Sequence, residues 1–538
     1  SEQNMANYGF IIDNRKCIGC HACTVACKSE HDVPIGVNRT WVKYIEHGEF
    51  PDSNRFFSVM RCNHCDDAPC TTICPVTALY RRDDGIIDFD NDRCIGCKAC
   101  TQACPYDALY IDPNTKTAAK CNYCTHRVDK GIEPACVVVC PVHAIISGDM
   151  DNPDSEISQL LTENTFEVRK PEKGTKPKVF YINAQPESLT PTASAKEASY
   201  LWGSQEEGVG HNANKGTEGL GEFKSPGTTT QAASVTGFGD FKEGTRTSYD
   251  APEKGILWGW EVPAYLMTKG IAAGTYLVHL ILWSLGYREP TLLVAVSLIC
   301  MFFLLVTGVL LILDMDRPDR FLNVLFRPQW KSWLVKGAYT IMGYGALLGV
   351  NLLIAFSESG NLIWAIMLLT GAFALLTGIY TAFLFAQARG RDYWQSPLLP
   401  YHMLSHIVML GASTLMILGT INHLFLDGFF SVLNLSGQDR LLYLVLLIPT
   451  AIILVLQVSE PIIKHGSRDA HLASLMMFRG RYRLHYWLGC VMIGCIIPLG
   501  LLMAAEGIAL VPLPFLIITG VWISNHLIVK IPQLIPLS

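Results

Sequence analysis

Long apolar stretches alternate with short polar connections along the chain from Trp258 onward. A helix needs about 20 predominantly apolar residues to cross the hydrocarbon core of a bilayer. One such stretch would fit a buried helix of a soluble protein, but a series of them requires a membrane. Prolines shorten or interrupt the sixth and eighth stretches. The pattern predicts an all-α bundle of eight transmembrane helices, at residues 263–286, 291–314, 334–356, 361–386, 402–425, 441–459, 486–505 and 508–529.

The character of the chain changes at two points before this bundle. Residues 1–185 are polar, with short strand-like runs such as GIIDFD at 85–90 and KVFYI at 178–182. Residues 186–257 are rich in Gly, Ser, Thr, Lys and Glu. Such a segment buries little apolar area, which is typical of a linker or of an extension that lies along a surface. We therefore expect three regions, at 1–185, 186–257 and 258–538.

The net charge and the N-terminal sequence argue against some classes of function and targeting. The net charge is only −5 and the basic residues form no long run, so we expect no nucleic-acid partner. The first seventeen residues contain no apolar h-region and no twin arginine, so we expect no signal peptide. Export of the polar region would then depend on another subunit or on the first membrane helix.

Cysteines are concentrated in the first region. Sixteen of the nineteen lie between Cys17 and Cys140. The other three, Cys300, Cys490 and Cys495, lie in apolar stretches and are expected to pack as small hydrophobic side chains. The sixteen form four quartets, of which the first and third share the spacing C-x2-C-x2-C-x3-C. In chain order the quartets are Cys17, Cys20, Cys23 and Cys27; Cys62, Cys65, Cys70 and Cys74; Cys94, Cys97, Cys100 and Cys104; and Cys121, Cys124, Cys136 and Cys140.

This spacing is typical of iron–sulfur ligands. Three cysteines within seven residues allow one loop to bind three corners of a cube, and the fourth then ligates a neighbouring cluster. Proline follows the fourth cysteine in three quartets, and Lys28 takes its place in the first. Structural zinc has no need of a third and fourth cysteine at these offsets, and disulfide frameworks are typical of small secreted domains. At four thiolates for each cube, the cysteines predict four [4Fe–4S] clusters as cofactors.

With these ordered quartets, residues 8–185 resemble the four-cluster ferredoxin-type electron-transfer subunits of molybdopterin oxidoreductase complexes, such as polysulfide, thiosulfate and dimethyl sulfoxide reductases. The resemblance implies an α+β ferredoxin-like iron–sulfur domain in which the outer quartets pair with each other, as do the inner ones. It also implies that the first ligand set lies nearest the catalytic partner and the last nearest the membrane. The implied sets are Cys17, Cys20, Cys23 and Cys140; Cys121, Cys124, Cys136 and Cys27; Cys62, Cys65, Cys70 and Cys104; and Cys94, Cys97, Cys100 and Cys74.

Two motifs identify the membrane half. WGWEVPAYLMTKGIAAGTYL at 258–277 and LDMDRPDRFLNVLFRPQWKSW at 313–333 resemble the NrfD/PsrC family of eight-helix quinone-binding membrane subunits. The chain thus resembles an electron-transfer subunit and a membrane subunit fused into one polypeptide. It has no visible pterin-binding region, so we expect the substrate site on a separate molybdopterin-type subunit, with at most the quinone half-reaction on this chain.

A quinone site needs an apolar slot and polar groups that bond the two quinone oxygens and exchange protons. Ionisable groups are costly in lipid and therefore indicate function. Tyr265 and Lys269 lie one turn apart on the first predicted helix and face the same way, and Asp314 and Asp316 end the second on the same side. The family resemblance implies that Tyr265 and Asp316 line the quinone pocket, with Tyr265 as hydrogen-bond donor and Asp316 as proton-exchanging acid. Lys269 is the third candidate.

Each candidate has a structural alternative. Asp316 fits an exposed loop acid or a helix cap. Tyr265 fits an interfacial aromatic belt, as do Trp258 and Trp260. Lys269 could extend to the lipid headgroups. Further polar residues on the later helices could form a proton route or be satisfied by neighbouring helices; these are His402, His406, His423, Glu460, His526 and Lys530.

Basic residues are unevenly distributed between the two sides of the predicted bundle. Twelve lie on the side of the polar region and two on the other, which by the positive-inside rule places the iron–sulfur domain on the cytoplasmic face of the inner membrane. The alternative is the periplasmic face, because these loops could be positive in order to dock the iron–sulfur domain. The twelve are Arg317, Arg320, Arg327, Lys331, Arg389, Arg391, Lys464, Arg468, Arg479, Arg481, Arg483 and Lys530, and the two are Arg288 and Arg440.

These observations favour a respiratory redox relay. Four clusters would carry electrons between a catalytic subunit and a membrane quinone, menaquinone or ubiquinone, near Tyr265 and Asp316. One alternative makes the membrane half a passive anchor without quinone chemistry. Another adds redox-coupled proton translocation.

Overall fold

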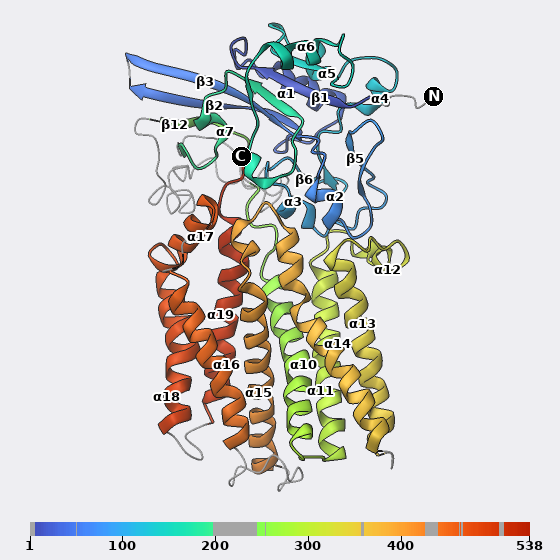
Figure 1. The fold of residues 1–538 in the computed structure, drawn as a ribbon, viewed down its shortest axis with the longest axis vertical. Coiled ribbons are helices and arrows are strands. Elements are labelled where there is room, and N and C mark those ends of the chain that lie inside the picture. Colours follow the sequence, from blue (N-terminus) through green and yellow to red (C-terminus); the bar gives the residue numbers. More distant parts are fainter. Residues whose placement is uncertain are drawn as a thin grey trace, which may run out of the picture.

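A computed structural model gives the arrangement of the chain, with the membrane helices below and the cysteine-rich region above them in Figure 1. The described residues are 6–49, 51–196, 245–252, 254–356, 360–425, 440–461, 463, 466–504 and 511–538. Lys464 and residues 197–244 of the expected extension lie outside them, as do the side chains of His423 and Arg440.

The first and last strands of the cysteine-rich region pair and close it into one domain. β1 (Tyr8–Asp13) lies parallel to β10 (Val179–Ile182) and antiparallel to β8 (Ile145–Asp149), and β9 (Phe166–Glu167) completes the sheet in the order β8-β1-β10-β9. β4 (Leu79–Arg81) and β5 (Ile87–Phe89) form a hairpin, as do β6 (Tyr110–Ile111) and β7 (Ala118–Ala119). Both strand-like runs expected from the sequence are therefore confirmed, as β5 and β10.

Short helices carry the cysteines between these strands. They are α1 (Ala22–Glu30), α2 (Pro69–Ile73), α3 (Ala99–Ala103), α4 (Thr125–Val128) and α5 (Ala135–Val138), followed by α6 (Glu156–Glu163). Each of the helices from α1 to α5 begins close to a cysteine that ends a tight loop. The domain therefore places its thiols at helix starts, where the backbone can wrap around a bound group.

The expected extension returns to this domain at both described ends. α7 (Pro186–Leu189) and β11 (Ala195–Lys196) follow β10, and β12 (Thr245–Tyr249) pairs with the long hairpin of β2 (Thr40–Glu49) and β3 (Asp52–Arg61). The second sheet has the order β11-β12-β2-β3. Trp41 Nε1 donates to Asp250 at 2.9 Å in the same region. The described ends of the expected extension are therefore part of the second sheet of the domain.

The membrane half contains seven described helices that are long and apolar enough to span a bilayer. The sixth expected helix, at 441–459, is represented by α16 (Arg440–Ser459), in which the described apolar segment Leu444–Ser459 is shorter than the other seven. The expected helix at 486–505 is a π-helical segment, η7 (His485–Ile496), continued by α18 (Ile497–Ala504). The others are α10 (Glu261–Ser284), α11 (Pro290–Leu313), α13 (Trp333–Ile354), α14 (Gly360–Gln387), α15 (Leu399–Phe425) and α19 (Leu513–Gln533).

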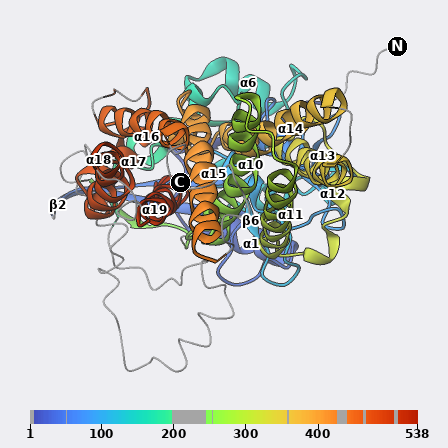
Figure 2. The same cartoon turned by 90° about the horizontal axis from the view of Figure 1, so that it is seen from below.

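The helices form two groups on either side of α15. Figure 2 shows α10, α11, α13 and α14 on one side and α16, α18 and α19 on the other, and α15 contacts α10, α16 and α19. Many large apolar side chains face outward, among them Phe302, Leu305 and Val455, each at least 62% exposed. Exposed apolar surface on this scale is stable in lipid and not in water.

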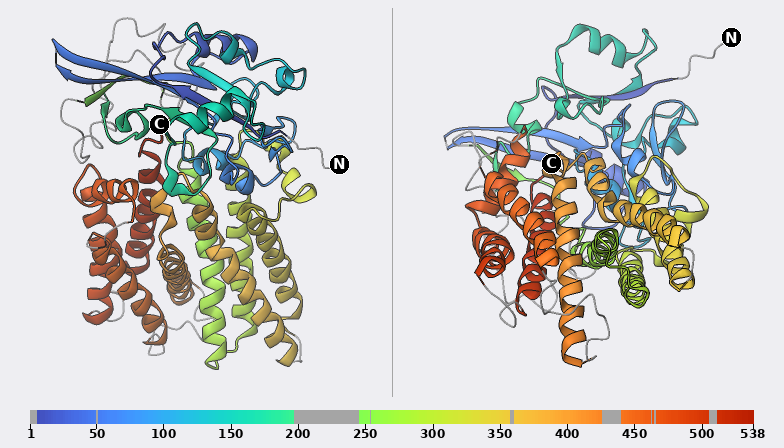
Figure 3. Two further views of the ribbon diagram at one scale, coloured as in Figure 1. Left: turned by 45° about the horizontal axis from the view of Figure 1, so that its top comes forward. Right: turned by 60° about the horizontal axis from the view of Figure 1, so that its bottom comes forward.

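The cysteine-rich domain is packed directly onto one end of the bundle (Figure 3). The connection from α11 to α13 contains η4 (Pro318–Arg320) and α12 (Asn323–Phe326), and that from α14 to α15 contains η5 (Asp392–Gln395). α17 (Arg468–Phe478) lies on the same side. A single buried cluster joins Ile73 and Ile95 of the domain to Trp258, Phe385 and Trp394 of the bundle. The two halves therefore share one hydrophobic core.

Candidate electron-transfer and quinone site

The structure brings cysteines of different quartets close to one another. The thiol of Cys27 interacts electrostatically with Cys121, Cys124 and Cys136 from the opposite end of the domain. Cys17 interacts in the same way with Cys20 and Cys140, and Cys70 with Cys62, Cys65 and Cys104. Cys97 and Cys100 both interact with Cys94 and Cys74. Cys27, Cys74 and Cys104 thus each lie near cysteines of another quartet, and Cys140 lies near Cys17.

The group nearest the bundle forms a cradle. Its four cysteines line one pocket, together with Lys98, Asp90 and apolar residues such as Ile95. Among the described residues, no three His, Cys, Asp or Glu side chains are placed for a single metal ion. A cube differs from a single ion because each cysteine binds a different iron atom. The cavity and its donor set therefore fit a cluster, and not one metal ion. The cysteines of the cradle are Cys74, Cys94, Cys97 and Cys100.

The backbone conformation of the cysteine loops is suited to binding a cluster. Gly19 and Gly96 have φ of 69° and 68°, and His21 and Lys98, which precede α1 and α3, are left-handed as well. Repeated positive φ turns the backbone N–H groups inward, where they can bond sulfur. The amide of Ala78 donates to Cys74 Sγ at 3.2 Å, and that of Ala144 donates to Cys140 Sγ at 3.2 Å.

Burial makes these thiols poor acids on their own. It raises the pKa of Cys62 to about 11 and those of Cys23 and Cys124 to about 12. A cysteine ligates metal as the thiolate, so metal binding must displace the proton and lower the pKa again. The buried cysteines have no partner in a disulfide. Their arrangement is therefore suited to iron–sulfur ligation and not to free thiol chemistry.

The loop that carries Cys94 and Cys97 is bonded to the loop that follows α11. The amide of Asp316 donates to Gly96 O and that of Arg317 to Ile95 O, both at 3.3 Å. A side chain at Gly96 would lie 2.8 Å from Cβ of Asp316 and 2.9 Å from the carbonyl oxygen of Lys116. Position 96 therefore requires glycine for two reasons, its positive φ and this close approach.

Lys98 connects this loop to both candidate acids. Its Nζ lies 3.4 Å from Asp316 Oδ1 and 3.7 Å from Asp314 Oδ1, and it donates to Asp314 O at 2.8 Å. Burial raises the pKa of Asp314 to about 7, against the opposite effect of Lys98. Burial also raises the pKa of Asp316. Both acids are thus held in a partly buried position where they keep a proton more readily than a carboxyl group in water, and Asp314 does so near neutral pH.

Tyr265 and Lys269 lie deeper, on α10. Tyr265 is 4% exposed and Lys269 is 1% exposed, so Lys269 does not extend to the headgroups as one alternative allowed. Lys269 Nζ donates to Thr381 Oγ1 on α14 and lies 4.3 Å from the centre of the Tyr380 ring. Tyr265 also hydrogen bonds Thr381 and interacts electrostatically with Asp314. The site therefore combines a phenol, an ammonium group and an acid between α10, α11 and α14.

Trp258 is buried and does not lie in the interfacial aromatic belt in which it was expected. It is 4% exposed, whereas Trp260 is 58% exposed and agrees with the belt. The indole Nε1 of Trp258 donates to the carbonyl oxygen of Cys97 at 3.2 Å. Its ring stacks on Phe385 and Trp394, with ring centres 5.8 and 5.4 Å away. Trp258 thus lies directly between the cradle and the bundle.

Sequence reasoning missed two members of this site and gave a third, Asp314, no role. Thr381 and Tyr380 lie on a helix whose polar residues carried no signal in the sequence, because Thr and Tyr are ordinary in membrane helices. Asp314 was noticed only as a helix end, yet it is the acid that interacts with Tyr265. Arg317 and Arg320 add contacts to the iron–sulfur domain. Besides pairing with Asp319, they donate to backbone carbonyls of the domain, at Thr115, Asn91 and Cys94.

Both halves of the chain are similar to known protein families. Residues 250–522, slightly more than half of the chain, match the family model described as polysulphide reductase, NrfD, and residues 53–150 match a 4Fe-4S dicluster domain. The chain belongs to the NrfD polysulphide reductase family. The front of this NrfD protein is 43% identical over 178 residues to a polysulfide reductase component of Wolinella succinogenes, which covers 32% of the chain and 93% of that protein.

Two further relatives match the same part of the NrfD protein. A tetrathionate reductase component of Salmonella typhimurium is 42% identical over 199 residues, or 36% of the chain and 79% of that protein. Protein NrfC of Escherichia coli is 44% identical over 182 residues, or 33% of the chain and 82% of that protein. The chain thus joins a 4Fe-4S electron-transfer module and a multi-pass NrfD membrane domain, and it is an electron-transfer subunit of the kind found in respiratory reductase complexes.

Proposed function

We propose that this chain carries electrons between a separate catalytic subunit, of molybdopterin type, and a membrane quinone that binds beside Tyr265, Lys269 and Asp316. The quinone would be menaquinone or ubiquinone. Four [4Fe–4S] clusters held by the sixteen cysteines would supply one-electron carriers between the two sites. The chain itself would then perform only the quinone half-reaction.

The contact between the Cys94–Cys100 loop and the ends of α10 and α11 carries the proposal. Lys98 follows Cys97 directly and binds Asp314 and Asp316, and Trp258 binds the carbonyl oxygen of Cys97. The candidate quinone residues are therefore neighbours of the last ligand set. Electrons could pass between them without crossing another domain.

The candidate residues supply what the quinone reaction needs. Complete reduction of a quinone takes two electrons and two protons, and oxidation of the quinol returns them. Tyr265 and Lys269 offer N–H and O–H donors to a quinone oxygen in a buried place, where such bonds are strong. Asp316 would exchange protons with the aqueous side, and Asp314 is the further acid, whose charge acts on Tyr265.

The test is quinol oxidation by the intact complex with Asp316→Asn, Asp314→Asn and Tyr265→Phe. Positioned proton-transfer groups contribute about 10²–10⁴-fold to a rate, so we expect turnover to fall at least about tenfold. Asp319→Asn is the matched control acid, because Asp319 is exposed in the same loop and pairs with Arg317. Tyr401→Phe is the control phenol, at 64% exposed.

The same measurements separate the proposal from a passive anchor. An anchor requires cluster content and assembly but no quinone chemistry. Full quinol turnover in all three variants, with normal iron content, would show that the membrane half only attaches the complex to the bilayer.

A further inference from the structure

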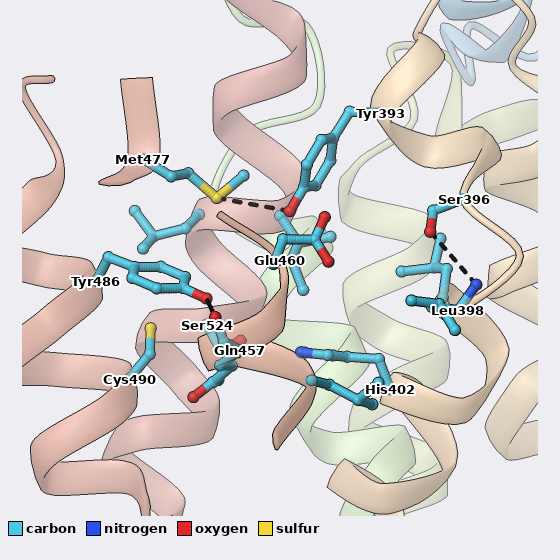
Figure 4. Close-up of a pocket in the computed structure, with 14 residues that line it drawn as sticks. Tyr393, Ser396, Leu398, His402, Gln457, Glu460, Met477, Tyr486, Cys490 and Ser524 are labelled. Atoms are coloured by element: carbon cyan, nitrogen blue, oxygen red, sulfur yellow. Dashed lines mark hydrogen bonds between the residues drawn. The ribbon is translucent and has the colours of Figure 1, made fainter. Parts of the chain in front are cut away.

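A second polar site lies in the other half of the bundle, away from Tyr265. Figure 4 shows a cavity between η5, α15, α16, the π-helical segment η7 and α19. The cavity volume is about 40 Å³, which is room for a few waters. Long π-helical segments are rare and often occur at functional sites. The size and position of the cavity therefore favour water and protons as its contents.

Two groups that can exchange protons face this cavity. The carboxyl group of Glu460, just after α16, and the imidazole of His402 on α15 both line it, and Figure 4 shows them extending into the same space. Nδ1 of His402 is buried and has no hydrogen-bond partner within the described part of the chain. A buried polar nitrogen of this kind is costly unless water bonds it. The remaining titratable groups that line the cavity are Tyr393, Tyr486 and Cys490.

Polar contacts continue from the cavity toward α10. His406 lies one helical turn beyond His402 on α15, deeper in the membrane. The ring centres of the two histidines are 4.3 Å apart. Nδ1 of His406 lies 3.2 Å from Asn525 Oδ1 on α19. Asn525 in turn donates to the sulfur of Met267 at 3.4 Å, on the helix that carries Tyr265 and Lys269. These contacts cross from the second group of helices to the first.

We infer that this cavity is a proton-exchange site that connects the aqueous side of the iron–sulfur domain, through Glu460 and water, with the buried His402–His406 pair. A proton leaves water for the carboxylate of Glu460, passes through cavity water to His402 and then to His406; the reverse order releases it. The inference rests on the proposed function in one respect: the quinone reaction is what consumes or releases the protons. Each quinone takes up two protons together with two electrons.

The exchange itself can be measured without quinone turnover. Infrared difference spectra of the complete complex, recorded between acid and alkaline pH, should contain a protonated-carboxyl band that disappears in Glu460→Gln and an imidazole signal that disappears in His402→Gln. Glu289→Gln and His485→Gln are the controls, since Glu289 lies at the start of α11 and His485 is exposed, and both should keep the two signals. Absence of the Glu460 and His402 signals from the wild-type spectrum would overturn the inference.

Kinetics test the connection to the quinone. Glu460→Gln and His402→Gln should each slow quinone turnover about tenfold or more and increase the solvent deuterium isotope effect, while reduction of the clusters by dithionite stays unchanged. Glu460→Asp, which keeps a titratable group, should retain most of the turnover. Unchanged turnover and isotope effect in both variants would overturn the connection. A wild-type complex that does not react with quinone would instead refute the proposed function, and the infrared spectra would still decide the exchange.

Discussion

Gly96 and Asp316 join the two halves of the molecule by backbone contact: the amide of Asp316 donates to the carbonyl oxygen of Gly96 at 3.3 Å. Gly96 belongs to the loop that presents Cys94 and Cys97, and Asp316 follows the second membrane helix. The position of the last ligand set relative to the membrane is therefore fixed by main-chain atoms. Side chains such as Lys98 add to a contact that exists without them.

Gly96→Ala should weaken the backbone contact between Gly96 and Asp316 for two reasons, backbone strain and a steric clash. The left-handed conformation costs about 1–2 kcal/mol for a residue with a Cβ, and the new Cβ would also collide with Asp316 and Lys116. We expect a large loss of quinol turnover and a changed EPR signal from one cluster.

Gly131→Ala is the matched control for this substitution. Gly131 has φ of 72°, close to the 68° of Gly96, but a Cβ there meets nothing within 4 Å. It should therefore show the cost of the backbone alone. Equal effects of the two substitutions on turnover and on the EPR spectrum would contradict the role given to the Gly96 contact.

The side of the membrane on which the iron–sulfur domain lies can be tested separately. The sequence predicts twelve basic residues on the side of this domain, and in the structure Arg317 and Arg320 donate to its backbone carbonyls, so docking accounts for part of the asymmetry. We still expect the cytoplasmic face. Lys130 is exposed on the domain, and Lys130→Cys should resist a membrane-impermeant thiol reagent in right-side-out vesicles. Rapid labelling there, with equal labelling after lysis, would favour the periplasmic face.

The cysteine pattern was the most informative part of the sequence because ligand chemistry constrains spacing. Cubane ligands are typically clustered cysteines, so the quartets that begin at Cys17, Cys62, Cys94 and Cys121 could be recognised from the sequence alone, although the last has a longer gap between its second and third cysteines. The membrane helices were equally readable, because lipid requires long apolar segments. Both signals are local in sequence.

The rest of the site depends on contacts between distant segments. Nothing near Trp258 in the sequence indicates that its indole reaches Cys97, 161 residues away. Thr381 became part of the site only because α14 packs beside α10. The π-helical form of residues 485–496 was not predicted either, since an apolar run gives the same signal for an α-helix. The return of β12 to pair with β2 likewise has no local signature.

Trp258 offers a direct test of the path between the cradle and the bundle. Trp258→Leu removes both the stack with Phe385 and Trp394 and the hydrogen bond to Cys97, whereas Trp258→Phe removes only the bond. We expect the rate of cluster oxidation by quinone, followed by stopped-flow absorbance, to fall strongly in the first variant and moderately in the second. Trp260→Leu, on an exposed side chain, should behave as the wild type. Equal rates in all four proteins would exclude a role for this side chain in the electron path.

The ligand sets can be tested through one cysteine that belongs to a distant group. Cys27 lies in the first quartet, yet the structure places its thiol beside Cys121, Cys124 and Cys136. Cys27→Ser should therefore disturb the cluster of the fourth quartet and leave that of Cys17 and Cys140 in place. The EPR spectrum should lose or change one signal, and the iron content should fall from about sixteen atoms, at four for each cluster, toward about twelve. Cys300→Ser is the control, because Cys300 is buried in the bundle and should leave the iron content unchanged. Loss of the cluster held by Cys17 instead would mean that each quartet ligates its own cluster.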